Sequence, residues 1–239
     1  MSSSRDISVV VPTHNRPEGL HNLFCSLDKL SGVVPSEVIV VDDGSQGHAT
    51  RTTIHSWLQH DHPYNPVVIV HNRSHGPGHA RNAGVKAASG QVIAFTDDDC
   101  MVDHHWLAGL TARLLPEKRI AGVGGHIMPM RSGIISRYYT FHRILEPPPS
   151  LLYLVSANCC YHRNALLEVG GFEVDIAEAG GEDVGLSFKL AKAGWKFTYA
   201  PEAVVYHEYR NNPLDFMRTF RNYGCGSRRV TERHFGKGG

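Results

Sequence analysis

Short apolar runs recur along the first half of the chain, separated by segments in which apolar residues return every three or four positions. Continuous runs rich in β-branched residues occupy residues 7–11, 38–41, 67–70 and 92–95. Runs of this length without polar alternation are typical of strands that are buried on both faces. The pattern therefore predicts four strands of a largely parallel sheet.

The segments between these runs have the apolar spacing of helices. A helix is predicted to begin at Pro17, with its apolar face formed by Leu20, Leu23, Phe24, Leu27 and Leu30. Residues 50–59 predict a second helix with Ile54, Trp57 and Leu58 directed inward, and residues 79–88 a third after a glycine loop. Strands and helices that alternate through residue 115 indicate a Rossmann-like half, in which ligands bind at the carboxyl ends of the strands.

The second half is less regular. Strands are predicted at 123–128, 155–161, 196–199 and 203–206, and a helix begins at Glu182 and stops at Gly194. Residues 130–155 contain three consecutive prolines, which exclude a continuous helix and predict a mobile or substrate-covering loop. Because no repeat or linker divides the sequence, we expect one domain.

Composition narrows the function classes. The 239 residues are 41% hydrophobic with a formal charge of +1, so a core is expected and a strongly electrostatic nucleic-acid partner is excluded. The five cysteines lack CxxC spacing, which predicts free thiols in a reducing compartment, with Cys159 and Cys160 on opposite faces of a strand. The absence of a signal-peptide core and of a long apolar run favours a cytoplasmic protein. The 16 histidines are scattered and are expected to be surface or structural residues.

Carboxylates directly follow two of the predicted strands. Asp97, Asp98 and Asp99 come after the run at 92–95, and Asp42 and Asp43 come after the run at 38–41. Parallel strands end at one edge of a sheet, so these acids should lie close together, where a divalent cation would relieve their repulsion and hold a diphosphate. The alternative is a solvated, Asp-rich turn. A Walker-type loop and a GxGxxG fingerprint are both missing, which argues against a dinucleotide oxidoreductase.

Three other segments offer chemistry. Arg81 lies in a glycine-containing segment and could reach a phosphate or a base, or it could be an ordinary surface arginine. Glu182 and Asp183 begin a helix after two glycines, which suits a general base on a hinged loop, although acids also favour helix N-termini through the macrodipole. His207 ends the last predicted strand and is either a metal ligand or a structural histidine.

Seven short motifs follow one another in a fixed order. They are VVPTHNRP at 10–17, VVDDGS at 40–45, ARNAG at 80–84, FTDDD at 95–99, VGGF at 169–172, GEDVGLS at 181–187 and APEAVVYH at 200–207. Each is weak alone, but in this order they resemble the family-2 glycosyltransferases of the GT-A fold over roughly residues 6–208. The resemblance implies an α/β domain with a Rossmann-like, mostly parallel central sheet flanked by helices, and a smaller mixed sheet on the acceptor side.

The resemblance also implies how one domain of residues 1–239 is organised. Residues 6–115 would form the half that binds a nucleotide sugar, residues 116–208 the acceptor-binding and catalytic half, and residues 209–239 a basic C-terminal segment. The implied reaction is metal-dependent, inverting transfer of a sugar from a nucleoside-diphosphate sugar to an acceptor hydroxyl. The acceptor class stays open among glycans, lipid-linked molecules and small molecules.

Roles for individual residues follow from the same resemblance. The residues implied to bind the nucleotide sugar are Pro12, Thr13 and Arg16 beside the base, Asp42 or Asp43, Arg81, Asp97 near the ribose, and Asp98. Asp99 and His207 would hold the metal. A shell of oxygen and imidazole ligands suits Mn²⁺ best, with Mg²⁺ as the other candidate.

The resemblance makes Asp183 the general base, while Glu182 would orient the acceptor. The acceptor hydroxyl has a high pKa and must lose its proton as it attacks, so a carboxylate has to lie within hydrogen-bond reach. We therefore expect burial to raise the pKa of Asp183 against the effect of the helix dipole.

Two other functions remain open from the sequence. A sugar-1-phosphate nucleotidyltransferase shares the nucleotide-binding half, but residues 12–16 lack the glycine-rich, basic loop that this class carries after its first strand. A non-catalytic module that binds nucleotide sugars or glycans would not need Asp183. The basic segment 209–239, with Phe216, Phe220 and Tyr223 among its arginines, could cover the diphosphate, contact an anionic membrane peripherally, or form a solvated helix.

Overall fold

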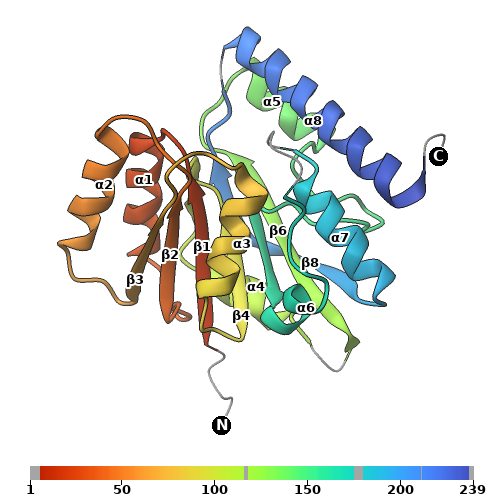
Figure 1. The fold of residues 1–239 in the computed structure, drawn as a ribbon, viewed down its shortest axis with the longest axis horizontal. Helices are drawn as coiled ribbons and strands as arrows, with labels where there is room; N and C mark the ends of the chain where they lie inside the picture. Colours follow the sequence, from red (N-terminus) through yellow and green to blue (C-terminus); the bar gives the residue numbers. More distant parts are fainter. Residues whose placement is uncertain (1–5, 116–117, 175–179, 211, 237–239) are drawn as a thin grey trace.

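The computed structural model describes residues 6–115, 118–174, 180–210 and 212–236, and in these ranges all eight strands form one mixed sheet (Figure 1). The strand order is β3-β2-β1-β4-β7-β6-β8-β5. The strands are β1 Ile7–Thr13, β2 Glu37–Asp42, β3 Asn65–Val70, β4 Val92–Thr96, β5 Cys100–Val102, β6 Ile120–Pro129, β7 Asn158–His162 and β8 Lys196–His207.

Helices cover both faces of this sheet. They are α1 Pro17–Leu27, α2 Ala49–Leu58, α3 Pro77–Ala87, α4 Trp106–Ala112, α5 Ile134–His142, α6 Arg163–Glu168, α7 Glu182–Lys192 and α8 Pro213–Phe235. One hydrophobic cluster packs α1, α2 and α4 on one face, and a second cluster packs α3, α6 and α7 on the other. Cys160 belongs to the first cluster and Cys159 to the second, which confirms their predicted placement on opposite faces.

The first half has the predicted parallel arrangement. β1 lies between β2 and β4, both pairings are parallel, and β3 adds a further parallel strand at the edge. The chain turns to opposite sides of β1 as it passes first to β2 and later to β4. Where the direction of strand addition reverses in such a sheet, here between β1 and β4, a crevice opens at the carboxyl ends of the strands. The acids after β2 and β4 lie at this edge.

The separate, smaller sheet that we expected on the acceptor side is not formed by the described residues. β7 pairs antiparallel with β4, placing Asn158 opposite Thr96, and β6 pairs with both β7 and β8. The strands of the second half therefore extend the first sheet, because they satisfy the backbone groups along the open edge of β4.

The two strands predicted at 196–199 and 203–206 are one strand, β8. Gly125 of β6 pairs with Ala200, whereas the next residue, His126, pairs with Val204. This register shift leaves residues 201–203 of β8 opposite no residue of β6, and Pro201, which has no N–H to donate, lies in that irregularity. The proline thus interrupts the ladder without ending the strand.

Other expectations need correction at the level of single elements. Helix α5 ends before the three prolines, so part of the segment predicted to be a loop is helical. Leu58, predicted to point inward, is 39% exposed at the last position of α2. The short elements β5, α4 and α6 were not predicted individually. No helix within the described residues is both long and apolar enough to cross a bilayer.

Candidate functional site

A cavity of about 720 Å³ opens at the carboxyl edge of the sheet, between the two halves of the domain. Its walls come from the ends of β1, β2, β4 and β8, the N-terminal turns of α3 and α7, and one side of α8. All but one of the predicted site residues line it: Pro12, Thr13, Arg16, Asp43, Arg81, Asp97, Asp98, Asp99, Glu182, Asp183 and His207. The fold therefore gathers segments that are far apart in the sequence.

Asp42 is the exception, because its side chain does not line the cavity. It is completely buried and its Oδ1 accepts a hydrogen bond from the Ser45 backbone N–H at 2.9 Å, which shapes the turn after β2. Asp43 lines the cavity instead. Of the two acids between which the sequence left the choice open, the structure places Asp43 where a ligand can approach.

Asp43 holds the far wall of the cavity together. Its Oδ2 accepts hydrogen bonds from the Ser74 hydroxyl, the His75 N–H and the Gly76 N–H at 2.8–2.9 Å, and its Oδ1 accepts one from the His71 ring at 2.7 Å. Burial alone would raise the pKa of Asp43, but the hydrogen bonds, that from His71 foremost, outweigh it and lower the pKa. Asp43 therefore stays ionised and fixes the chain from 71 to 76.

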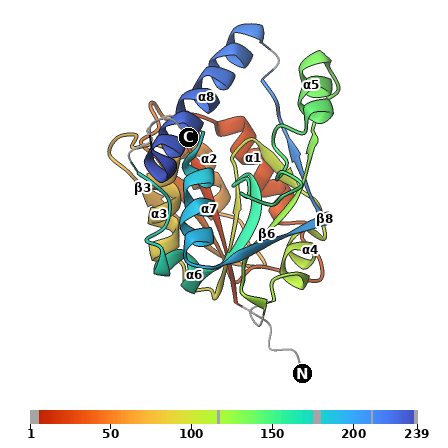
Figure 2. The same cartoon turned by 90° about the vertical axis from the view of Figure 1, so that its right-hand side faces the viewer.

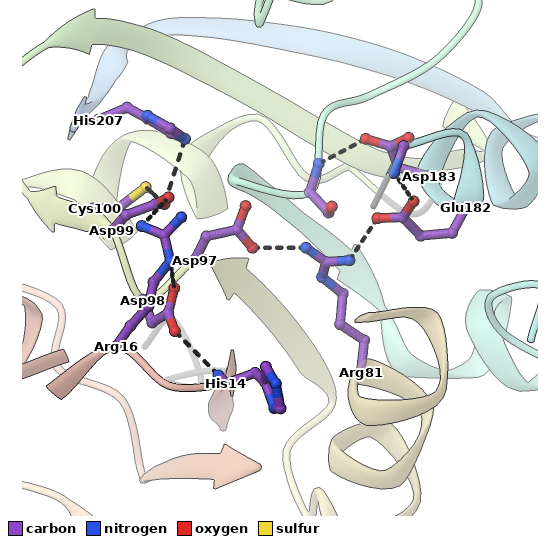
Figure 3. A network of polar contacts seen from close by, with 12 residues as sticks. His14, Arg16, Arg81, Asp97, Asp98, Asp99, Cys100, Glu182, Asp183 and His207 are labelled. Atoms are coloured by element: carbon purple, nitrogen blue, oxygen red, sulfur yellow. Dashed lines mark hydrogen bonds and ion pairs between the residues drawn. The ribbon is translucent and has the colours of Figure 1, made fainter. Parts of the chain in front are cut away.

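The three carboxylates after β4 have different sets of partners, although Asp98 and Asp99 both contact Arg16 (Figure 3). Asp97 accepts from Arg81 at 2.6 Å, and Asp98 accepts from the Thr13 hydroxyl at 2.7 Å and the His14 N–H at 3.3 Å. Burial, followed by the charge of Asp99, raises the pKa of Asp98. Asp98 thus joins the ends of β4 and β1 at the inner wall of the cavity, and all three carboxylates line the cavity.

Asp99 lies between two cationic or potentially cationic groups. Its Oδ2 is 2.9 Å from an Arg16 guanidinium nitrogen, and its Oδ1 is 3.4 Å from Nε2 of His207. The backbone pairs Cys100 in β5 with His207 in β8, which brings the two segments together. Arg16, expected beside the base, therefore lies against Asp98 and Asp99, where it neutralises part of their charge.

The donor set around Asp99 fits a divalent metal. Asp99, Cys100 and His207 each offer one ligand atom, and these atoms lie within 4.8 Å of one another. The His207 Nδ1 is buried and has no hydrogen-bond partner among the described residues. Burial raises the pKa of the Cys100 thiol well above its usual range, so it stays protonated and is a poor ligand. Asp99 and His207 remain as one oxygen and one nitrogen ligand, which suits Mn²⁺ or Mg²⁺.

Arg81 joins the acidic triplet to the start of α7. One guanidinium nitrogen donates to Asp97 and the other donates to Glu182 at 2.8 Å, while the guanidinium also lies 5.7 Å from the centre of the Phe172 ring. Arg81 is only 3% exposed. Both terminal nitrogens, which we expected to reach a phosphate or base, therefore hold carboxylates in this structure.

Asp183 lies on the first turn of α7, after Gly180 and Gly181. These glycines have φ angles of 124° and 101°, in a region that other residues rarely adopt, and they aim the helix N-terminus at the cavity. The Asp183 carboxylate accepts from the backbone N–H groups of Val184 at 2.8 Å and Ser156 at 3.4 Å. Burial, followed by the charge of Glu182, raises its pKa well above the usual range, as expected for a general base near neutral pH.

Several residues that line the cavity were not among the predicted site residues. Tyr153 comes from the segment predicted to be a loop, Ser156 from the segment predicted to be a strand, and Phe220, Tyr223 and Ser227 come from α8. Phe220 and Tyr223 were predicted only to belong to a basic segment that could cover the diphosphate. The backbone of α8 approaches the loop before α7 so closely at Gly226 that any side chain there would overlap the carbonyl oxygen of Gly180. The sequence signal for these α8 residues was the set of aromatic residues interleaved with arginines after residue 209. One side of α8 covers the cavity.

The fold and the site together define an α/β protein with a metal-compatible acidic centre and a half-buried carboxylate, that of Asp183, in the same cavity. The family model described as glycosyl transferase family 2 matches residues 8–170, and the chain belongs to this family. A pre-mycofactocin glycosyltransferase of Mycobacterium tuberculosis is 31% identical over 246 residues, covering 97% of this chain. The chain spans 49% of that relative's length.

Solved structures support the GT-A fold. A mannosyltransferase from Pyrobaculum calidifontis, solved with GDP-Man and Mn²⁺, superposes with a TM-score of 0.75 at 21% identity, over 92% of this chain and 61% of that one. GalNAc-T7, solved with UDP, GalNAc and Mn²⁺, superposes with a TM-score of 0.72 at 22% identity, over 97% of this chain and 48% of that one. At this identity the likeness establishes the fold.

Proposed function

We propose that this protein transfers a sugar, with inversion, from a nucleoside-diphosphate sugar to an acceptor hydroxyl, with a divalent metal bound by Asp99 and His207. The observation that carries the proposal is that the Asp99–His207 pair and the half-buried Asp183 line one cavity. Membership of glycosyl transferase family 2 supports the reaction class. The similar structures solved with GDP-Man or UDP and Mn²⁺ support the donor class and the metal.

On the donor side, each element has a separate task. Pro12, Thr13 and the chain held by Asp43 form the wall on which the nucleoside would lie, and Asp97 faces the cavity beside them. A bound metal supplies Lewis-acid neutralisation of the charge that develops on the departing diphosphate. Arg16 contributes a second positive charge at the same end of the cavity.

On the acceptor side, Asp183 removes the proton of the attacking hydroxyl. Its raised pKa places its ionisation closer to neutral pH, where a carboxylate is a stronger base than an ordinary aspartate. Arg81 keeps Glu182 in place, and Glu182 Oε2 accepts the Gly180 N–H at 2.9 Å. We propose that Glu182 thereby fixes the loop that presents Asp183, and that inversion follows from attack on the face opposite the diphosphate.

The proposal is tested with a panel of UDP-, GDP- and dTDP-sugars in the presence of Mn²⁺. Release of a nucleoside diphosphate from one member, lost on chelation of the metal and in Asp99→Asn, is the expected result. Failure of every nucleoside diphosphate to bind with Mn²⁺ would contradict the proposal. Pyrophosphate release from a nucleoside triphosphate and a sugar phosphate would instead favour the nucleotidyltransferase reading, and donor binding without turnover would favour a binding module.

We also propose that the acceptor is met at a membrane surface on the cytoplasmic side. Helix α5 and the first turns of α8 project beyond the carboxyl edge of the sheet in both views (Figures 1 and 2). Their apolar side chains Ile134, Phe141, Leu214 and Met217 are more than 60% exposed, and exposed arginines lie among them. Apolar side chains ringed by basic ones suit an anionic lipid interface.

The membrane contact is tested by sedimentation with lipid vesicles. Binding to vesicles that contain anionic lipid, weakened in Ile134→Ser/Phe141→Ser, is expected, and no binding to purely zwitterionic vesicles. The five free cysteines fit the reducing compartment that a cytoplasmic location implies. Equal recovery with and without anionic vesicles would exclude the membrane from the proposal and leave the donor chemistry untouched.

A further inference from the structure

Three histidines that the proposed reaction does not use lie together behind Asp43. His71, His75 and His79 follow one another at intervals of four residues, from the end of β3 through the loop to the first turn of α3. Their ring centres are 5.7 Å (71–75), 5.1 Å (71–79) and 4.6 Å (75–79) apart. None of the three lines the cavity. The sequence did not predict this cluster. A spacing of four residues brings side chains together on a helix, but most of this segment is a loop.

The loop that carries these rings is held in shape by β2 and the turn after it. The His71 N–H donates to the Asp42 carbonyl at 2.8 Å, and Asp43 accepts the backbone N–H groups of His75 and Gly76. Gly76 has a φ of 92°, which lets the chain turn sharply into α3. The three imidazoles are therefore brought together by fixed backbone, and their proximity does not depend on flexible side chains alone.

The spacing of the rings matches what a single metal ion requires. Zinc–nitrogen bonds of about 2.0–2.1 Å in tetrahedral geometry place the centres of two coordinated imidazoles roughly 5 Å apart. Asp43, His71 and His79 each offer one ligand atom, and these atoms lie within 4.8 Å of one another. The His79 Nδ1 is buried and has no hydrogen-bond partner among the described residues, which leaves a nitrogen lone pair or proton unsatisfied at this point.

The ligand set is mixed in character. Asp43 supplies a carboxylate beside the imidazoles of His71 and His79, and a carboxylate would partly balance the charge of a bound cation.

We propose that Asp43, His71 and His79 form a second metal site, with His75 in reach as a further ligand, for a transition-metal ion of the zinc type. Imidazole-rich ligand sets favour Zn²⁺ and its neighbours in the transition series over Mg²⁺ or Ca²⁺, which prefer oxygen. The site shares no residue with the Asp99–His207 pair and differs from it in offering at least two imidazoles. A bound ion would lock the loop whose Ser74 and Gly76 form part of the cavity wall.

The test measures zinc binding and does not depend on sugar transfer. Isothermal titration with Zn²⁺ is carried out on Asp99→Asn/His207→Asn protein, so that the Asp99–His207 pair cannot contribute. One zinc per chain is expected, and adding His71→Asn/His79→Asn should weaken the binding by about 100-fold or more, because two ligands are lost together. Circular dichroism and thermal unfolding check that each variant is folded.

A matched control removes another pair of potential zinc ligands. His21 and Cys25 lie one turn apart on α1, with Nε2 and Sγ 3.8 Å from each other and exposed. His21→Asn/Cys25→Ser should leave the zinc affinity unchanged.

A second measurement works without substituting the cluster. Crystals of the Asp99→Asn/His207→Asn protein are soaked in zinc, and diffraction is measured on both sides of the zinc absorption edge. An anomalous peak between Asp43 and His79 supports the proposal. The proposal is overturned if the Asp99→Asn/His207→Asn protein binds no zinc, or if its anomalous peak lies away from Asp43 and His79. It is also overturned if zinc binding survives His71→Asn/His79→Asn, or if it is lost in His21→Asn/Cys25→Ser.

Discussion

Replacing Arg81 with methionine should destabilise the fold by about 3–5 kcal/mol, the usual consequence of leaving a buried charge without its partner. The side chains of Arg81 and Glu182 are 4% and 5% exposed, whereas that of Asp97 is 27% exposed. Without the guanidinium, Asp97 can regain water but Glu182 cannot. Most of the lost stability should therefore come from Glu182.

The assay is equilibrium unfolding in urea, followed by tryptophan fluorescence, together with thermal unfolding. A loss of this size corresponds to a decrease in unfolding temperature of about 6–20 °C for a domain of this length. Adding Glu182→Gln to Arg81→Met should recover at least about 1 kcal/mol, because the unpaired charge is removed. In the protein that keeps Arg81, the same Glu182→Gln change should instead reduce stability.

Two results would contradict this role of Arg81. One is a loss of less than about 1 kcal/mol in Arg81→Met, which would mean that the pair contributes no more than a surface salt bridge. The other is an equal effect of Glu182→Gln with and without Arg81, since two residues that interact cannot give additive changes.

Other predictions concern Asp183 and helix α8. Because the pKa of Asp183 is raised in the folded state, its ionised form opposes folding, most strongly above the folded-state pKa, so Asp183→Asn should be more stable by about 1–2 kcal/mol at pH 8. The difference should shrink as the pH falls below the folded-state pKa and vanish near the pKa of an ordinary aspartate, about 4; urea unfolding at several pH values measures this. For the same reason kcat should decrease with falling pH in a range well above the pKa of ordinary aspartates, and a rate that stays constant down to pH 5 would argue against Asp183 as the base. Gly226→Ala should lower the free energy of unfolding by about 1–3 kcal/mol and expose α8 to proteolysis, because the new methyl group overlaps Gly180. Gly224→Ala has open space around it and should be neutral or slightly stabilising. Similar effects of the two substitutions would contradict the docking of α8.

The parallel half of the sheet was predictable because each strand is a continuous apolar run and each helix has a regular apolar face. The predicted strands at 7–11, 38–41, 67–70 and 92–95 correspond to β1, β2, β3 and β4, differing only at their ends. Each strand can be recognised from its own residues, because a strand buried on both faces of the sheet is a continuous apolar run. Leu58 was wrongly predicted to be buried, because helical spacing does not show at which residue the last turn of a helix extends beyond the core.

The second half was harder because its structure depends on distant partners. That β7 joins the edge of β4 is decided by pairing across more than 60 residues, which no local pattern records. Two strands were predicted on either side of Pro201, whereas the register shift between β6 and β8 accommodates this proline within one strand. The docking of α8 depends on the close approach of Gly226 to the loop before α7, and the sequence does not show that contact.

The residues of the candidate site were largely predictable, but several of their contacts were not. Acids at the ends of β2 and β4 identify the edge of the sheet at which the cavity opens, and the motif order strengthened the choice of Asp183 and His207. The sequence does not show that Arg81 joins two carboxylates, that Arg16 lies against Asp99, or that three histidines meet behind Asp43. These contacts arise from the way loops from different strands meet.

We propose that donor binding and acceptor activation are separate in this site, with Asp183 serving only the second. The most direct test compares Asp183→Asn with the unchanged protein for the affinity of a nucleoside diphosphate with Mn²⁺ and for the rate of sugar transfer. We predict an affinity within about threefold of the original and a transfer rate reduced by about 10²–10⁴-fold, the usual contribution of a general base. Unchanged turnover, or a loss of transfer matched by an equal loss of nucleotide affinity, would contradict the account.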